Sequence, residues 1–388
     1  MRRFFRALAV AGLVAAVPAL TGITPAGAAV KPSWKLVQEF GISYGSPQLQ
    51  GGVAVNAKSA WIEGYTFETE NSVFLAHWNG TRWSQVAGPS ALRSATAGVS
   101  PGPIAVSGAA LWDFPTQFAS TTKVYAARLS GGRWTTWRLR GALRIDGAAV
   151  FGNSDVWAFG EAVLPKGWLG LENGPRFAEH FNGKRWQRVS LPGVPLIVNA
   201  LSRNDIWAYG PTNRTASAEN QSFIAMHWNG HKWRTLAIPR IRATNGKLMW
   251  PAGLAVLKHD SLWVTEDFHC PTPGSCNPPQ PAGIILAHWN GHRWVRKLDS
   301  SAYEVPGVES DARGGLWIEA LTAKHSRWAF LHYSRGKISV SFVPGTAAGS
   351  PVNVSGPIPV PGTSRPWSTA DVDLGGGQTV AAVFRYSS

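Results

Sequence analysis

Carboxyl groups are the side chains of this sequence best suited to carry chemistry. Glu161 lies four residues after Trp157, and Glu266 and Asp267 closely follow Trp263. Two carboxyls at a suitable separation can act as acid and base, or as nucleophile, in glycoside cleavage. These three acids are therefore the catalytic candidates. No complete acid–base motif surrounds them, so a binding role is favoured over catalysis.

The two cysteines of the chain, Cys270 and Cys276, lie in the segment that follows these acids. In an oxidising compartment we expect them to form a disulfide that stiffens this segment. A metal site needs several convergent ligands, and His269 beside Cys270 is too few. The sequence therefore predicts no metal and no cofactor.

One short motif recurs along the chain. Residues 77–83 read HWNGTRW, and close copies occupy 180–186, 227–233 and 288–294, with weaker copies at 128–134 and 332–338. Asn-Gly between aromatic and β-branched runs predicts a hairpin with a type I′ turn. Each copy should therefore be two antiparallel strands.

A second tryptophan precedes each hairpin and marks an earlier strand, with a short apolar strand before it. These tryptophans recur every 45 to 56 residues, at Trp61, Trp112, Trp157, Trp207, Trp263, Trp317 and Trp367. Four-stranded units of this length are typical of β-propeller blades. The predicted fold is all-β: a seven-bladed propeller of four-stranded antiparallel blades.

The two ends of the chain complete one blade. The last unit stops at its third strand, near Phe384 and Tyr386, while residues 33–37 around Trp34 match a fourth strand. The N-terminal strand should therefore complete the last blade and close the ring, which removes exposed strand edges.

With these repeats, the chain resembles the tryptophan-rich seven-bladed β-propellers of secreted bacterial proteins, which are broadly kelch-like or galactose-oxidase-like. The resemblance covers essentially the whole chain after its leader, and it implies the fold without implying an activity. The regular paired glycines of kelch repeats are missing. A radical-copper site would need an unpaired cysteine, which the expected Cys270–Cys276 disulfide denies.

The first 28 residues have the pattern of a signal peptide. Arg2, Arg3 and Arg6 precede an apolar run at 7–20, and an Ala-x-Ala site ends at Ala28. We expect cleavage there, a single propeller domain at 29–388, secretion, no stable membrane anchor and a monomer. The general and twin-arginine export routes stay open. Loss of three arginines lowers the net charge from +15 to +12, and an exported protein is not expected to bind nucleic acid.

Residues that recur in most units should serve the blade, and residues that do not recur are better candidates for function. We expect structural roles for His77, His180, His227, His288 and His332, which occupy one repeat position. Their expected partners are turn acids such as Asp155, Asp205 or Asp260. A sugar platform fits only the unrepeated tryptophans, Trp137, Trp168, Trp250 and Trp328.

The connections between second and third strands are longest in units three to five, at 161–176, 211–221 and 267–282. Loops on a rigid scaffold often carry function, so this long-loop face is the predicted binding face. The candidate ligand-binding residues are Trp168, Glu172, Asn173, Arg214, Asn220, Glu266, Asp267 and His269.

Basic residues recur at the opposite, hairpin end of the units. They are Arg82, Arg133, Arg185, Lys232, Arg293 and Lys337. Such a ring could hold an anionic wall polymer with salt-sensitive affinity, although ordinary solvated turn residues are the favoured interpretation. The leading hypothesis is a secreted non-catalytic propeller that binds a glycan, peptide or cell-wall component through the long-loop face. The alternatives are a lyase or glycoside hydrolase, and a structural partner in a surface assembly.

Overall fold

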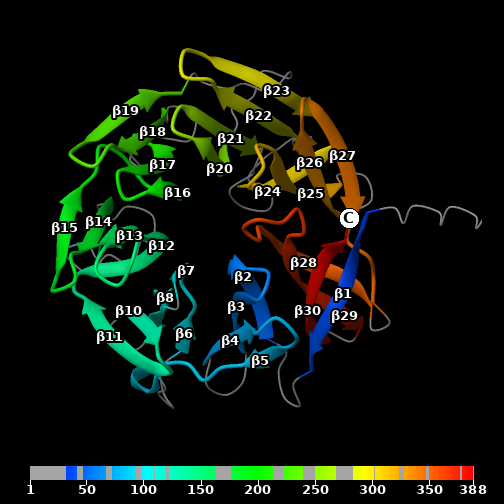
Figure 1. The fold of residues 1–388 in the computed structure, drawn as a ribbon, viewed down its shortest axis with the longest axis horizontal. Coiled ribbons are helices and arrows are strands. Elements are labelled where there is room, and N and C mark those ends of the chain that lie inside the picture. The colour runs from blue at the N-terminus through cyan, green and yellow to red at the C-terminus, as the bar shows by residue number, and fades with distance from the viewer. Residues whose placement is uncertain are drawn as a thin grey trace, which may run out of the picture. The chain divides into compact units, whose positions relative to one another are not determined.

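A computed structural model of the protein describes the blades and most of the turns. The described residues are 32–41, 47–66, 72–92, 98–108, 110–118, 122–162, 176–212, 222–238, 250–267, 283–300, 302–322, 327–346, 349–375 and 378–387. They all belong to one compact unit that spans Pro32–Ser388. Within it, seven antiparallel sheets surround a central axis and form a seven-bladed β-propeller (Figure 1).

Each blade runs from an inner first strand to an outer fourth strand. Blade 1 contains Pro47–Asn56 (β2), Ser59–Thr66 (β3), Ser72–Trp78 (β4) and Trp83–Gln85 (β5), followed by a short 3₁₀ turn at Ser90–Leu92 (η1). Blade 2 contains Gly98–Ser100 (β6), Ile104–Ser107 (β7), Ala110–Asp113 (β8), Thr116–Phe118 (β9), Lys123–Ser130 (β10) and Arg133–Leu139 (β11). Blade 3 contains Ala142–Val150 (β12), Val156–Ala162 (β13), Arg176–Phe181 (β14) and Trp186–Ser190 (β15). Blade 4 contains Ile197–Ser202 (β16), Asp205–Pro211 (β17), Phe223–Trp228 (β18) and Trp233–Ala237 (β19).

Blades 5 to 7 follow the same order. Blade 5 contains Trp250–Lys258 (β20), Ser261–Asp267 (β21), Ile284–Trp289 (β22) and Trp294–Ser300 (β23). Blade 6 contains Tyr303–Ser310 (β24), Leu316–Thr322 (β25), Trp328–Ser334 (β26) and Lys337–Phe342 (β27). Blade 7 contains Ser350–Ile358 (β28), Trp367–Gly375 (β29), Gln378–Ser387 (β30) and, from the N-terminal end, Ser33–Phe40 (β1).

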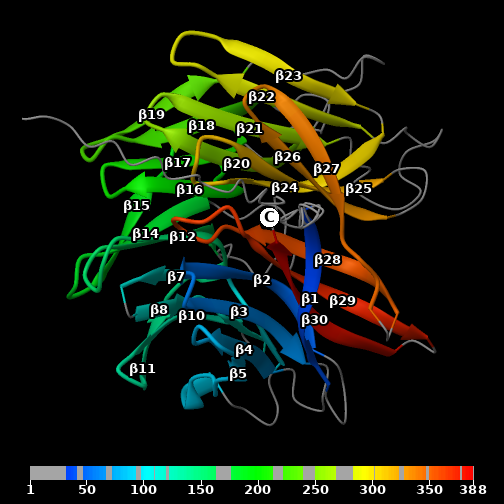
Figure 2. The same cartoon turned by 45° about the vertical axis from the view of Figure 1, so that its right-hand side comes forward.

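The N-terminal strand closes the ring as predicted. β1 pairs antiparallel with β30, with Trp34 opposite Tyr386, and both views show the two strands side by side (Figures 1 and 2). Trp34 is 3% exposed, its ring centroid lies 4.5 Å from that of Phe330, and its Nε1 donates to Ser341 Oγ at 3.1 Å. Trp34 therefore joins blade 7 to blade 6.

The hairpins are present, but the turn type differs between strong and weak copies. In the HWNGTRW copy, Trp78 pairs with Trp83, so the loop has four residues rather than the two of a type I′ turn. The Asn79 side chain accepts the backbone N–H groups of Thr81 and Arg82 at 3.0 and 3.1 Å, and Gly80 alone takes a positive φ. The type I′ prediction is therefore wrong for the strong copies, because the asparagine acts through its side chain instead of adopting a left-handed backbone.

Two-residue turns with positive φ at both positions occur in the weaker copies. Gly131 and Gly132 form one such turn, and Arg335 and Gly336 form the other.

Blade 2 has the same four-strand plan with its two inner strands interrupted. β6 and β7 are separated around Pro101 and Pro103, and β8 and β9 around Pro115. Proline has no N–H group to donate to a sheet, so the backbone hydrogen bonds between neighbouring strands are interrupted at these residues.

The core lies between neighbouring blades. The second-strand tryptophan of one blade packs against aromatic residues on the outer strands of the next. Trp157 lies 5.1 Å from Trp228 and 6.1 Å from Trp233 between ring centroids, and Trp367 contacts Trp78 across the closing seam at 5.1 Å. The predicted blade-to-blade role of the repeated tryptophans is confirmed. Within the described residues, no helix has the length and apolar character needed to cross a bilayer.

Candidate functional site

A cavity of about 320 Å³ lies among the innermost strands. Its walls come from β2, β7, β12, β16, β24 and β28, which ring the axis in Figure 1. Most of the lining side chains are small and apolar, from Gly52–Ala54, Ile104–Val106 and Ala148–Phe151. Glu309 contributes a carboxyl and Asn199 an amide.

Strand register explains why these two polar residues face the cavity. Each inner strand places one residue directly opposite the second-strand tryptophan. In blade order these residues are Val53, Ala105, Ala149, Asn199, Ala255, Glu309 and Ile358. Glu309 and Asn199 are thus the polar exceptions at a position that is otherwise apolar.

Glu309 has an unusual electrostatic setting. It is half-buried in an apolar wall, and burial raises the pKa of its carboxyl to about 7. A carboxyl with this pKa changes charge near neutral pH. Glu309 is not among the residues predicted from the sequence. It becomes apparent when the first strands of the blades are aligned by the residue that lies opposite the second-strand tryptophan.

Glu266, predicted for both catalysis and binding, lies within the seam between blades 4 and 5. It is 1% exposed, and Tyr209 from the neighbouring blade donates its hydroxyl to the Glu266 carboxyl. Burial raises the pKa of Glu266 to about 8, while the hydrogen bond from Tyr209 and the charge of Arg296 act in the opposite direction. Burial also raises the pKa of Tyr209 well above its usual value, and the charge of Glu266 and the hydrogen bond to it raise this pKa further.

Glu161, the second catalytic candidate, is fully buried and forms an ion pair within blade 3. Arg144 Nη2 lies 2.9 Å from Glu161 Oε1, and the two residues are cross-strand neighbours on β12 and β13. Glu161 and Glu266 therefore occupy different blades, and each has a partner in the protein interior.

Other second-strand acids follow the same principle at neighbouring seams. Asp371 of blade 7 accepts the backbone N–H of Leu49 in blade 1 at 3.4 Å. Burial, and then the neighbouring Asp113 of blade 2, raises the pKa of Glu63 in blade 1 well above its usual value. Glu319 is also buried, and burial raises its pKa well above normal. The second-strand acids are thus enclosed by the blades.

Most of the predicted ligand-binding residues fall outside the described part of the chain. These are Trp168, Glu172, Asn173, Arg214, Asn220 and His269, and the cysteines Cys270 and Cys276 share that position. For Asp267 only the backbone is described, as the last residue of β21. The signal peptide also lies outside the described residues. The roles of these residues, including the disulfide, stay predictions.

The repeated histidines each stack on the tryptophan opposite them. His77 on Trp61 and His227 on Trp207 have ring centroids 4.2 Å apart. In the two blades without histidine, arginine takes this place, and Arg385 lies 5.0 Å from the Trp367 ring centroid. All seven blades therefore use this position for packing.

The partners predicted for these histidines are mostly correct. His180 bonds Asp155 at 3.0 Å and His227 bonds Asp205 at 2.9 Å. His288 bonds Ser261 at 2.9 Å rather than Asp260, which lies on the exposed turn.

The end of the blades that carries these turns is basic. We call it the hairpin face: the turns between first and second strands and those between third and fourth strands. Its lysines and arginines are Lys58, Arg82, Arg133, Lys184, Arg185, Arg203, Lys232, Lys258, Arg293, Arg313, Arg335, Lys337 and Arg365, and all are exposed. Its acids are Asp155, Asp205, Asp260 and Asp311. The third-to-fourth-strand hairpins contain eight of the cations and no acid.

Known structures resemble this chain in fold. An ulvan lyase of polysaccharide lyase family PL25, bound to -[GlcA(1-4)Rha3S]-, shares 11% identity, with 89% of this chain and 95% of that chain covered and a TM-score of 0.57. The β-propeller domain of the Trilobed protease from Pyrococcus furiosus shares 8% identity over 88% of this chain and 96% of that chain, with a TM-score of 0.52. YCF48 bound to D1 peptide shares 12% identity over 92% and 95%, with a TM-score of 0.50.

At these identities the likeness extends to the fold alone. The three propellers belong to a lyase, a protease and a peptide-bound protein, so the fold does not select one function. No family model matches the chain, and no curated protein matches it.

Proposed function

We propose that this chain is a secreted, non-catalytic binding propeller that holds an anionic cell-wall glycan or polymer on its hairpin face. The observation that carries the proposal is the charge of the six hairpins between third and fourth strands, which present eight exposed cations without an acid. A periodic array of cations attracts a polyanion over a long contact.

The acids of the same face do little to cancel this charge. Asp155, Asp205 and Asp311 accept hydrogen bonds from histidines of their own blades. The side chain of Asp260 is 70% exposed, and its nearest histidine contact is the longer one of 3.9 Å to His259 Nε2. The face has thirteen lysines and arginines against four acids, so its net charge is positive.

The described carboxyls support binding over acid–base catalysis. Cleavage by a carboxyl pair needs two acids facing one substrate. The central cavity has Glu309 as its carboxyl, and Glu161 and Glu266 are enclosed in different blades. A lyase or hydrolase reading would need Glu266 to leave its contact with Tyr209.

The long-loop face is the second candidate surface for a glycan, peptide or wall component. A ligand bound on this face would contact Trp168, Asp267 and their neighbours in the long connections. A neutral glycan would use that face, because aromatic stacking needs no charge on the sugar.

The experiment measures retention of the mature chain on two immobilised polymers, a phosphate-bearing teichoic acid and neutral dextran. We expect binding to teichoic acid, with affinity falling steeply between about 0.05 and 0.5 M salt because screening shortens the range of the charges. Reversal of two hairpin cations, Lys184→Glu with Arg185→Glu, should weaken binding roughly tenfold.

A matched control has the same change of charge at the other end of a blade. Arg138 and Arg140 are exposed near the end of β11, away from the hairpins. Arg138→Glu with Arg140→Glu should leave retention almost unchanged. Equal losses in both variants, or retention that ignores salt, would contradict the hairpin-face proposal.

Two further outcomes separate the alternatives. Retention on dextran that Trp168→Ala abolishes would move the site to the long-loop face. Shortening of a polysaccharide that stops in Glu266→Gln would make the protein an enzyme.

A further inference from the structure

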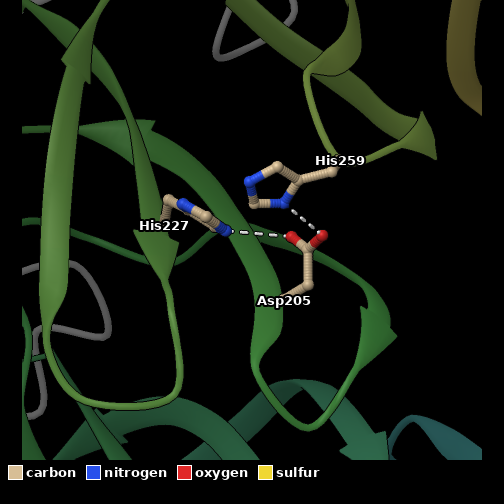
Figure 3. A group of neighbouring side chains, drawn as sticks. All are labelled: Asp205, His227 and His259. Atoms are coloured by element: carbon tan, nitrogen blue, oxygen red, sulfur yellow. Dashed lines mark hydrogen bonds and ion pairs between the residues drawn. The ribbon is translucent and has the colours of Figure 1, made fainter.

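Three side chains that can ligate a metal converge where blade 4 meets blade 5. Asp205 begins β17, His227 lies on β18, and His259 lies on the turn between β20 and β21 (Figure 3). Asp205 Oδ1 lies 2.9 Å from His227 Nε2, and Asp205 Oδ2 lies 2.8 Å from His259 Nδ1. One ligand atom from each of the three residues falls within 4.8 Å of the others.

Two of these side chains are held firmly by the blade. Trp207 Nε1 donates to Asp205 Oδ1 at 2.8 Å, and the His227 ring stacks on Trp207 with an angle of 14° between planes. Such supporting contacts orient metal ligands in known sites. The third ligand, His259, has a side chain that is 63% exposed, so an ion can reach it from solvent.

The chain provides its own comparison one blade earlier. Asp155 bonds His180 at 3.0 Å, and Arg203 of the next blade approaches Asp155 at 3.6 Å. Arg203 therefore has the same place beside Asp155 that His259 has beside Asp205, since each lies in the turn between the first and second strands of the next blade. An arginine guanidinium is always protonated and has no lone pair to offer.

Blade 6 keeps the carboxylate, with Asp311 bonded to His332 at 2.9 Å, whereas blades 1 and 5 have serine at this position. His77 meets Ser59 and His288 meets Ser261, at 3.1 and 2.9 Å. The pairing of histidine with tryptophan is common to the repeat. Among the residues that the structure describes, a carboxylate shared by two imidazoles occurs at the seam between blades 4 and 5. The feature that is not repeated is therefore the combination of one carboxylate with two imidazoles.

We propose that Asp205, His227 and His259 bind a divalent ion of the zinc class. Two imidazole nitrogens and one carboxylate are the donor set of many zinc sites that keep a fourth position open. Ligand atoms around tetrahedral zinc lie about 3.3 Å apart. The three ligand atoms now lie within 4.8 Å of one another, and a small movement of the exposed turn that carries His259 would bring them to the shorter distance. The bonds to the ion would then replace the hydrogen bonds that Asp205 accepts from the two histidines. Such an ion joins blade 4 to blade 5 and stabilises their seam.

The test is titration with cobalt and zinc of the untagged mature chain carrying Cys270→Ser and Cys276→Ser, so that no thiol competes for the ion. We expect one equivalent of bound cobalt with the intense visible absorption of a four-coordinate site. Zinc should displace the cobalt and raise the melting temperature, because an ion that binds the folded state stabilises it.

Two reciprocal variants separate metal binding from simple packing. His259→Arg copies the arrangement of Asp155 with Arg203, so the melting temperature without metal should stay close to the parent value while zinc affinity falls by at least about tenfold. Arg203→His should create a second site with Asp155 and His180 and add a second equivalent of bound cobalt.

The proposal fails if the parent chain binds zinc more weakly than about 1 mM, or if His259→Arg binds zinc as well as the parent does. The metal test is distinguishable from the wall-polymer proposal, because the cations of the hairpins between third and fourth strands are unchanged in all of these variants. Arg203→His removes one other cation of the hairpin face, so this variant is assayed for metal binding alone.

Discussion

The contact between Glu266 and Tyr209 makes the seam of blades 4 and 5 sensitive to pH. The Glu266 carboxyl is 1% exposed, and burial raises its pKa to about 8. In the unfolded chain the pKa of this group returns to 4.5. The change Glu266→Gln removes the titration and keeps an amide oxygen that can still accept from Tyr209.

The sign of the effect follows from where the proton is held. Below pH 4.5 both states are protonated, and the full stabilisation is present. As pH rises from 4.5 to 8 the unfolded state ionises while the folded state keeps its proton, so stability is lost across that window. Each pH unit within it costs about 1.4 kcal/mol, which gives a loss of about 4 kcal/mol between about pH 5 and 8.5.

The assay compares urea denaturation of the parent and Glu266→Gln chains, followed by tryptophan fluorescence at several pH values. The free energy of unfolding should be similar for the two chains near pH 5. Near pH 8.5 the variant should be the more stable by about 4 kcal/mol. The difference between the chains is the measured quantity, since other acids with a raised pKa, such as Glu309, titrate in both.

A second variant tests the role assigned to the hydroxyl. Because its hydrogen bond lowers the pKa of Glu266, Tyr209→Phe should raise that pKa further, so the loss of stability should continue to higher pH and become larger in total. Parallel pH profiles for the parent and Glu266→Gln would refute the reasoning, since they would mean that Glu266 ionises in the folded protein as it does in the unfolded chain.

Three further changes test the fold and the cavity. Trp34→Ala should lower the free energy of unfolding by about 3–5 kcal/mol, because the ring closes the seam between blades 6 and 7; an unchanged urea midpoint would contradict this. Gly210→Ala should destabilise by more than about 2 kcal/mol, since its Cβ would lie 1.9 Å from the Val194 carbonyl oxygen, whereas Gly307→Ala, with nothing within 4 Å, should behave like the parent. Glu309→Gln should remove a loss of stability that the parent shows as pH rises from 4.5 through about 7, and equal pH dependence of melting temperature in both chains would argue against a raised pKa.

The fold could be predicted because its determinants are local and repeated. An Asn-Gly pair between aromatic residues specifies a hairpin within a few residues, and seven copies of a unit that cannot bury its faces alone require a ring. The closure by Trp34 followed from a missing fourth strand at one end and a spare strand at the other. The turn type was wrong because a side-chain hydrogen bond of Asn79 and an Asn-Gly backbone turn have the same sequence.

The candidate site was harder to predict. Glu161 and Glu266 were chosen because they follow a tryptophan, yet burial and their partners Arg144 and Tyr209 decide what they do. Glu309 could not be predicted in this way, because it is a single residue within an inner strand and no sequence motif surrounds it. Its meaning appears only when the inner strands are aligned through their pairing with the tryptophans.

Contacts between blades explain both the errors and the route to correct them. Tyr209 and Glu266 are 57 residues apart, and Asp205 and His259 are 54 residues apart. Both separations are close to one blade, because the ring brings each position beside its counterpart in the next unit. A search within one unit therefore finds the repeated histidine and tryptophan but misses the partner across the seam. Comparison of each residue with the one about a blade further along would place His259 beside Asp205 and Arg203 beside Asp155, and the difference between histidine and arginine there is what turns a common seam contact into a proposed metal site.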